Sequence, residues 1–236
     1  MRSTPSRTLA GAALAAVALV ACGGGSSPGA SVPPSSQPPA SATGTPGAPA
    51  SSPASSPGQS PVPVESNPPG DIPDTTRYVT YTSSKGHFAV KVPEGWSRST
   101  TSSSVTFTDK LNSITATWSK ASAAPTPSSA KSKDVPMLRR TVPAFTLKHI
   151  IDCAPSCTIP YTTGPIVLNL PSTHAVVISY LANSAPNAVT GKQYRDEVER
   201  LEFFHNGTEV ALTLSGPVGS DNKDPWRLVA ESFRWA

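Results

Sequence analysis

The sequence predicts an α+β domain in which an antiparallel sheet is flanked by helices. Strand-like segments joined by turn residues recur from residue 78 onward, and Asn206-Gly207 joins two of them as the preferred two-residue hairpin turn. Near the end of the chain, apolar side chains recur at helical spacing: Trp226, Val229, Ala230 and Phe233. A helix with one apolar stripe packs on an apolar surface, and the predicted sheet supplies one.

The first residues have the pattern of a secretory signal peptide. Arg2 and Arg7 precede an apolar run over residues 9–21, which is shorter than the ~20 residues that span a bilayer. Leu19-Val20-Ala21-Cys22 resembles the bacterial lipobox, in which the cysteine receives a diacylglycerol and becomes the mature N-terminus. An ordinary signal peptide that contains a cysteine is the alternative. We expect residues 1–21 to be a lipoprotein signal peptide and Cys22 to be lipidated, which places the protein at the extracytoplasmic face of the cell membrane.

Residues 22–76 are expected to form a disordered tether. After Cys22 this stretch consists almost wholly of Pro, Ser, Ala, Gly and Thr, with three charges and no aromatic residue. Such a composition buries too little apolar surface to offset the entropy of ordering, and its prolines favour extended chain. A spacer through the cell-wall layer is the simpler interpretation, and a Pro-rich ligand for a partner is the alternative.

Residues 77–236 are expected to form one globular domain, long enough to bury a core without help. The whole chain has 19 Lys and Arg against 15 Asp and Glu, a formal net charge of +4. The basic residues are scattered rather than clustered on one segment. Nucleic acid is therefore not an expected partner.

In the first half of this domain, two hairpins and a short helix are predicted. Residues 78–82 and 87–92 form one strand pair around a Ser-Ser-Lys-Gly turn, and residues 105–108 and 114–118 form another. A loop rich in Ala, Pro and Ser follows. Asp134 is then the predicted N-cap of a helix that ends before Pro143.

In the second half, the apolar patterns predict further strands and the closing helix. Residues 145–152 favour a strand over a helix, and the strands 166–168 and 174–182 follow, with an all-apolar run typical of a strand buried on both faces. The Asn206-Gly207 turn sets a register in which one face carries only apolar side chains: Leu201, Phe203, Val210, Leu212 and Leu214. Asp221 or Asp224 is the predicted cap of the last helix.

Two cysteines remain in the domain, Cys153 and Cys157. Outside the cytoplasm a close pair indicates a disulfide, and one that closes so short a loop pins a turn rather than holding the whole fold. A metal site is the alternative, but two thiols with no neighbouring histidine supply only two of the four ligands of a tetrahedral site. A redox motif would have two intervening residues rather than three.

No catalytic, cofactor-binding or metal-binding residues are predicted. The four histidines, His87, His149, His174 and His205, stand alone in the sequence without metal-ligand spacing. No nucleophile elbow and no phosphate-binding loop occurs. The densest acidic cluster, from Asp196 to Glu202, is interleaved with arginines and is interpreted as a solvated edge.

The segment Phe88-x-Val90-x-Val92-Pro93-x-Gly95-Trp96 resembles the start of PsbP-like domains, and the closing hairpin and helix resemble their end. The resemblance implies an α/β/α sandwich, found also in LpqN-type actinobacterial lipoproteins, over residues 77–236. Most members of that family are binding or assembly factors rather than enzymes. We therefore expect a non-enzymatic binding or accessory module, with an envelope transporter, another envelope protein or an apolar ligand as partner. Its site would be an uncovered sheet face or a groove under residues 121–133. The alternatives are a cell-envelope hydrolase whose residues converge only in three dimensions, and a structural wall spacer.

Overall fold

The computed structural model describes residues 57–66 and 69–236, all within the unit Gly47–Ala236. The predicted signal peptide, Cys22 and most of the predicted tether lie outside the described residues. Helix and strand bounds below therefore refer to the described part of the chain.

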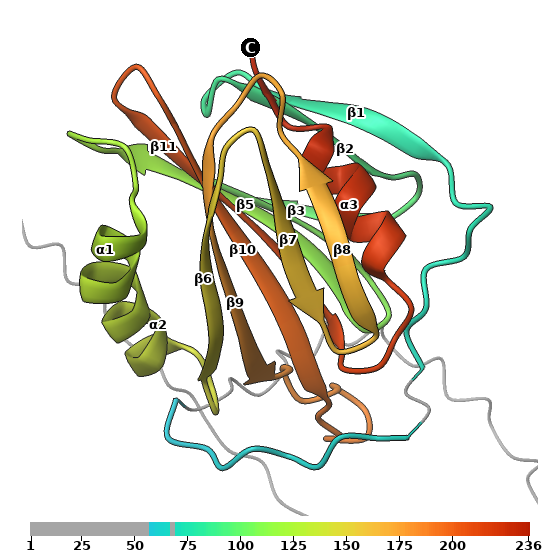
Figure 1. Ribbon diagram of the computed structural model, residues 1–236. Helices are drawn as coiled ribbons and strands as arrows, with labels where there is room; N and C mark the ends of the chain where they lie inside the picture. Colours follow the sequence, from blue (N-terminus) through green and yellow to red (C-terminus); the bar gives the residue numbers. More distant parts are fainter. Residues whose placement is uncertain (1–56, 67–68) are drawn as a thin grey trace, which may run out of the picture. The chain divides into compact units, whose positions relative to one another are not determined.

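The strands form three antiparallel sheets (Figure 1). The largest has the order β3-β4-β5-β11-β10-β9-β6, the second has the order β1-β2-β12, and β7 and β8 pair only with each other. The strands are β1 (Tyr78–Ser83), β2 (Phe88–Pro93), β3 (Ser97–Thr100), β4 (Ser104–Asp109), β5 (Asn112–Lys120), β6 (Thr146–Cys153), β7 (Ser156–Tyr161), β8 (Gly164–Asn169), β9 (Ala175–Asn183), β10 (Arg195–His205), β11 (Thr208–Pro217) and β12 (Arg234–Trp235).

Helices cover both faces of the seven-stranded sheet (Figure 1). One helical segment runs through α1 (Pro127–Ser129), the π-helical turn η1 (Ala130–Asp134) and α2 (Val135–Thr141), and Val135 and Leu138 bury against β9. On the other face α3 (Lys223–Glu231) buries Trp226 and Val229 in the larger core. Full burial of such a side chain stabilises the fold by roughly 1.5–3 kcal/mol. The predicted fold class, an antiparallel sheet flanked by helices, is confirmed.

The β10–β11 hairpin has the predicted register, with His205 opposite Thr208 and Phe203 opposite Val210. Asn206 and Gly207 have φ values of 46° and 73°, the positive values that a two-residue type I′ turn requires. The predicted apolar face is buried in the larger core. The all-apolar start of β9 is buried on both faces, as its sequence predicts.

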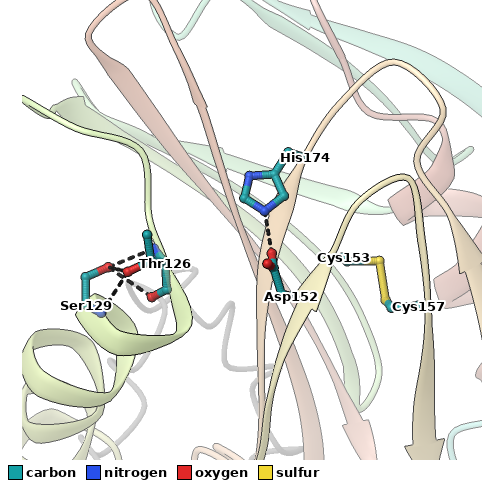
Figure 2. Close-up of polar contacts among 6 residues, drawn as sticks. All are labelled: Thr126, Ser129, Asp152, Cys153, Cys157 and His174. Atoms are coloured by element: carbon teal, nitrogen blue, oxygen red, sulfur yellow. Dashed lines mark hydrogen bonds and ion pairs between the residues drawn. A yellow bond between two sulfur atoms is a disulfide. The ribbon is translucent and has the colours of Figure 1, made fainter.

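The predicted helix caps are wrong in both halves of the domain, although α2 begins directly after Asp134 and ends before Pro143, as the sequence predicts. The first helical segment begins at Thr126, whose side chain accepts a hydrogen bond from the Ser129 N–H while Ser129 Oγ accepts from the Thr126 N–H (Figure 2). Asp134 therefore lies inside the helical segment and makes no capping bond. At α3 the capping position belongs to Asn222, whose side chain bonds elsewhere.

Two strands have no strong sequence signal. Every residue of β3 is exposed, so no apolar alternation marks this edge strand. β7 begins only three residues after Cys153, and it carries Pro160, a residue type that argues against a strand when it is met in a sequence. β7 pairs only with β8, so a residue without an N–H donor is tolerated there.

Residues 69–76, predicted as part of the tether, contact the domain through a cluster of amides. The Ile72 N–H donates to Asn222 Oδ1 at 2.8 Å, and Ile72 is 5% exposed. Asn222 Nδ2 and Asn112 Nδ2 both donate to the Gly70 carbonyl, at 3.0 and 2.6 Å. We call residues 57–66 and 69–76 the strap.

The earlier part of the strap lies along the loop between β9 and β10. Asn183 accepts a hydrogen bond from the Val62 N–H at 3.1 Å and donates one to the Ser60 carbonyl at 2.8 Å. Lys192 forms an ion pair with Glu65 in the same region. Backbone that the sequence assigns to the tether is therefore hydrogen-bonded by the side chains of Asn112, Asn183 and Asn222.

Candidate functional site

The two cysteines of the domain form a disulfide between the end of β6 and the start of β7 (Figure 2). Their Cα atoms are 4.9 Å apart, and Cys153 is fully buried. The predicted pairing of Cys153 with Cys157 is confirmed. Cys22 lies outside the described residues, so its lipidation stays a prediction.

The four histidines separate into two groups. His149 lies on β6, and His174 forms an ion pair with Asp152 of the same strand, with side chains 42% and 59% exposed (Figure 2). An exposed pair of this kind contributes little stability and leaves both residues at the surface. His87 and His205, by contrast, line one pocket although they are far apart in the sequence.

This His87–His205 pocket is an open hollow of about 500 Å³. It lies among the turn after β1, the end of β5, the tip of the β10–β11 hairpin and the residues after α3. Its lining residues are His87, Lys120, His205, Asn206, Thr208, Trp235 and Ala236.

Backbone pairing brings these residues together. Lys120 and His205 both lie opposite Thr208, on the two strands that flank the start of β11. The Ala236 N–H donates to the His87 carbonyl at 2.9 Å, which fixes the last residues against the β1–β2 turn. Lys120 Nζ donates to Thr208 Oγ1 at 3.4 Å.

The aromatic wall of the pocket continues into the core. The rings of His205 and Trp235 lie 5.5 Å apart between centroids, and Trp235 meets Phe233 edge-on at 5.3 Å. Phe233 stacks on Phe203 at 3.8 Å with an interplanar angle of 6°. Because Phe203 is fully buried, the indole of Trp235 is held by the core rather than by the surface alone.

The two other large hollows carry charges of both signs. One, of about 480 Å³ along α3, contains Lys91 and Arg234, and its Arg227 forms an ion pair with Asp224 at 2.8 Å. The other, of about 570 Å³ beside the strap, contains the ion pair between Arg77 and Glu94. The His87–His205 pocket differs because none of its lining side chains is acidic. None of these three hollows is lined by residues 121–133, where a groove was expected.

Three carboxylates predicted to form a solvated edge are instead buried. Asp196, Glu199 and Glu202 are 7%, 1% and 0% exposed, because β10 is an interior strand between β9 and β11. The interpretation as a solvated edge is wrong for these residues. Burial raises the pKa of Glu199 to about 8 and the pKa values of Asp196 and Glu202 to about 7.

Each buried carboxyl has one polar neighbour and one oxygen without a hydrogen bond. Ser179 Oγ donates to Glu199 Oε2 at 2.6 Å, and Arg200 Nε donates to Glu202 Oε1 at 2.8 Å. Ser179 and Glu199 form a hydroxyl–carboxyl pair, but both are buried within the sheet. A substrate cannot reach this pair, so it does not form a hydrolytic site.

The described residues contain no group of three or more His, Cys, Asp and Glu side chains arranged to hold a metal ion. In the same part of the chain, no helix has the length and apolar character needed to cross a bilayer.

Comparisons with known proteins give structural similarity only. No family model and no curated protein matches the sequence. The chain is similar to cyanobacterial PsbP (CyanoP) from Synechocystis, with 13% identity and a TM-score of 0.45 over 72% of this chain and 100% of that one. It is also similar to a Pseudomonas aeruginosa protein of unknown function described as a putative regulator, with 11% identity, a TM-score of 0.37, and 66% and 94% of the two chains covered.

A structure from Bacteroides thetaiotaomicron is similar at 10% identity and a TM-score of 0.39, over 66% of this chain. The chain spans about half the length of that protein, 48%. Similarities at this level carry no functional argument.

Proposed function

We propose that this chain is a membrane-tethered extracytoplasmic lipoprotein that acts as a non-enzymatic binding or accessory module. The lipobox-like Cys22 supports the anchor, and the Pro- and Ser-rich residues after it support a spacer. The observation that carries the binding role is the His87–His205 pocket, an open hollow with an aromatic wall and several hydrogen-bond donors.

The anchor is tested by metabolic labelling with a palmitate analogue. Lipidation requires the Cys22 thiol, so the wild-type chain incorporates label and Cys22→Ala does not. Labelling of Cys22→Ala at the wild-type level would contradict the proposed anchor.

The binding role is tested by site-specific photo-crosslinking of the full chain in its own membrane. A benzoylphenylalanine at position 205 places the reactive group at the pocket, and one at position 167 is the matched control. Val167 is 53% exposed on β8. We expect a specific adduct from position 205 that position 167 does not give. Identical adducts from both positions, or none from position 205, would contradict a binding role for the pocket.

A further inference from the structure

The helical segment α1–η1–α2, on the side of the sheet opposite α3, presents basic side chains to solvent (Figure 1). Lys131 and Lys133 lie in η1, and Arg139 and Arg140 lie in the last turn of α2. All four side chains are exposed, whereas the buried residues of the segment pack on β9 and β10. We call these four residues the basic face.

The charges of the basic face are mostly unpaired. Among the described residues, the ion pairs that join Lys or Arg to Asp or Glu all use other residues: Arg77–Glu94, Lys192–Glu65, Arg200–Glu202 and Arg227–Asp224. The one acidic residue of the helical segment, Asp134, is half-buried and lies near Arg200 as well as Lys133. Glu209 of β11 also lies near Lys133 and offsets part of its charge. The other three basic side chains keep their charge toward solvent.

This face holds most of the positive charge that the chain has in excess. Residues 131–140 contain four basic residues and one acidic residue, and the formal net charge of the whole chain is +4. Along the sequence the basic residues look scattered, but the fold places these four on the solvent side of one helical segment. Cations in the last turn of a helix interact favourably with its dipole, which accounts for Arg139 and Arg140. Lys131 and Lys133 lie earlier in the segment, so the dipole does not account for them.

The lipid anchor proposed above would bring an anionic surface within reach of the basic face. Residues 23–56 separate Cys22 from the first described residue, and a coil of that length spans roughly 30 Å. A link of this kind gives the domain an effective concentration near the millimolar range at the membrane, so a weak contact is sufficient for docking. Each Lys or Arg close to anionic lipid strengthens binding by about fivefold.

We propose that the basic face docks the domain on anionic phospholipid headgroups of the membrane that holds its anchor. The inference rests on the anchor in the proposed function and adds an orientation to it. The domain lies against the membrane with α1–η1–α2 toward the lipid, rather than at the far end of an extended spacer.

The test is photo-crosslinking of the full lipidated chain to phospholipid, in vesicles of phosphatidylcholine alone or mixed with phosphatidylglycerol. A benzoylphenylalanine at position 132 reports on the basic face, and one at position 167, exposed on β8, is the control. We expect position 132 to give at least about fivefold more lipid adduct in the anionic vesicles. This gain should be lost in 1 M salt, where the Debye length is about 3 Å, and position 167 should show no gain. Equal yields from position 132 in both vesicles, as for a face that serves an acidic polymer, would overturn the proposal.

Two double variants locate the contact. Arg139→Gln with Arg140→Gln should lower the adduct yield in anionic vesicles to the yield in neutral ones. Lys85→Gln with Arg98→Gln removes the same charge from exposed positions in the β1–β2 turn and on β3, and should change nothing. An equal loss in both double variants would overturn the assignment to the basic face.

The outcomes separate this inference from the proposed function. A chain that carries the palmitate label but gives equal adducts from neutral and anionic vesicles would reject the docking face and leave the anchor in place. A chain without the label would contradict the anchor, and its adducts after addition to the same vesicles would still test the basic face.

Discussion

The side-chain amide of Asn222 donates a hydrogen bond to Oδ1 of Asn112 at 3.0 Å, and both residues are at least 95% buried. The same two amides donate to the Gly70 carbonyl, and Asn222 Oδ1 accepts from the Ile72 N–H. Two side chains from the start of β5 and of α3 thus satisfy backbone groups of the strap. Because Asn112, Asn222 and Ile72 are buried, the hydrogen bonds between the two asparagines and the strap satisfy polar groups that lie away from the surface, and the strap packs as part of the folded domain.

Asn222→Ala should destabilise the domain. It removes three hydrogen bonds and leaves the Ile72 N–H buried without an acceptor, which costs about 2–3 kcal/mol. Urea unfolding of the full chain measures the change. Asn169→Ala is the control, because this exposed residue loses only the bond from its side chain to Glu231. Equal stability of the Asn222 and Asn169 variants would show that the amide cluster contributes nothing.

Gly216→Ala should disturb the same cluster of amides from the neighbouring strand β11. A Cβ atom at this position would lie 2.5 Å from Asn112 Oδ1 and 2.9 Å from Asn222 Nδ2, closer than real contacts allow. Since both amides are held on several sides, the cost is about 1–3 kcal/mol in the free energy of unfolding. Gly58→Ala, where nothing lies within 4 Å, is the matched control and should be neutral. A wild-type unfolding midpoint for Gly216→Ala would contradict this packing.

Truncation separates the strap from the rest of the predicted tether. A chain that begins at residue 57 keeps the contacts of Val62 and Ile72, whereas one that begins at residue 77 loses them. We expect the shorter chain to be less stable by at least about 2 kcal/mol. It exposes the apolar surface that Ile72 covers, and it removes the hydrogen bonds that Asn112 and Asn222 make to the strap. Chemical unfolding of the two chains compares them directly. Equal stability would place the start of the domain at residue 77, as the sequence predicts.

The sequence predicts those elements whose pattern is local. Apolar alternation around Asn206-Gly207 is sufficient to set the β10–β11 register, because the turn type and the buried face both depend on neighbouring residues. The role of Asn222 is not accessible in this way. Its partner Ile72 is 150 positions away, and the sequence around α3 predicts Asp221 or Asp224 as the cap and assigns Asn222 no role.

For the candidate site, too, the sequence predicts the local elements and not the contacts between distant residues. The sequence identifies His87 and His205 as residues beside hairpin turns, but only strand pairing through β11 and the docking of β12 on β2 bring them to one pocket. The interpretation of the acidic cluster as a solvated edge is wrong for a similar reason. Alternating Glu and Arg is typical of an exposed strand, and nothing local shows that β10 has a neighbour on each side.

The buried carboxyls predict that the domain loses stability as the pH rises. Burial raises the pKa of Glu199 from 4.5 to about 8, against the hydrogen bond from Ser179, so the folded state holds a proton that the unfolded chain releases above pH 4.5. The contribution is complete below pH 4.5, declines as the pH rises toward 8, and is lost above it. Asp196 and Glu202, whose pKa values burial raises to about 7, act in the same direction.

Glu199→Gln removes one of these titrations. The amide keeps an acceptor for Ser179 and carries no charge at any pH, so this variant should gain stability over wild type as the pH rises from 5 to 8. The slope of unfolding free energy against pH should become shallower by up to about 1.4 kcal/mol per pH unit between pH 5 and 8. Urea unfolding at pH 5, 6, 7 and 8 measures both slopes. A Glu199→Gln variant that follows the wild-type slope throughout would show that Glu199 is ionised in the folded state, with its charge compensated inside the sheet.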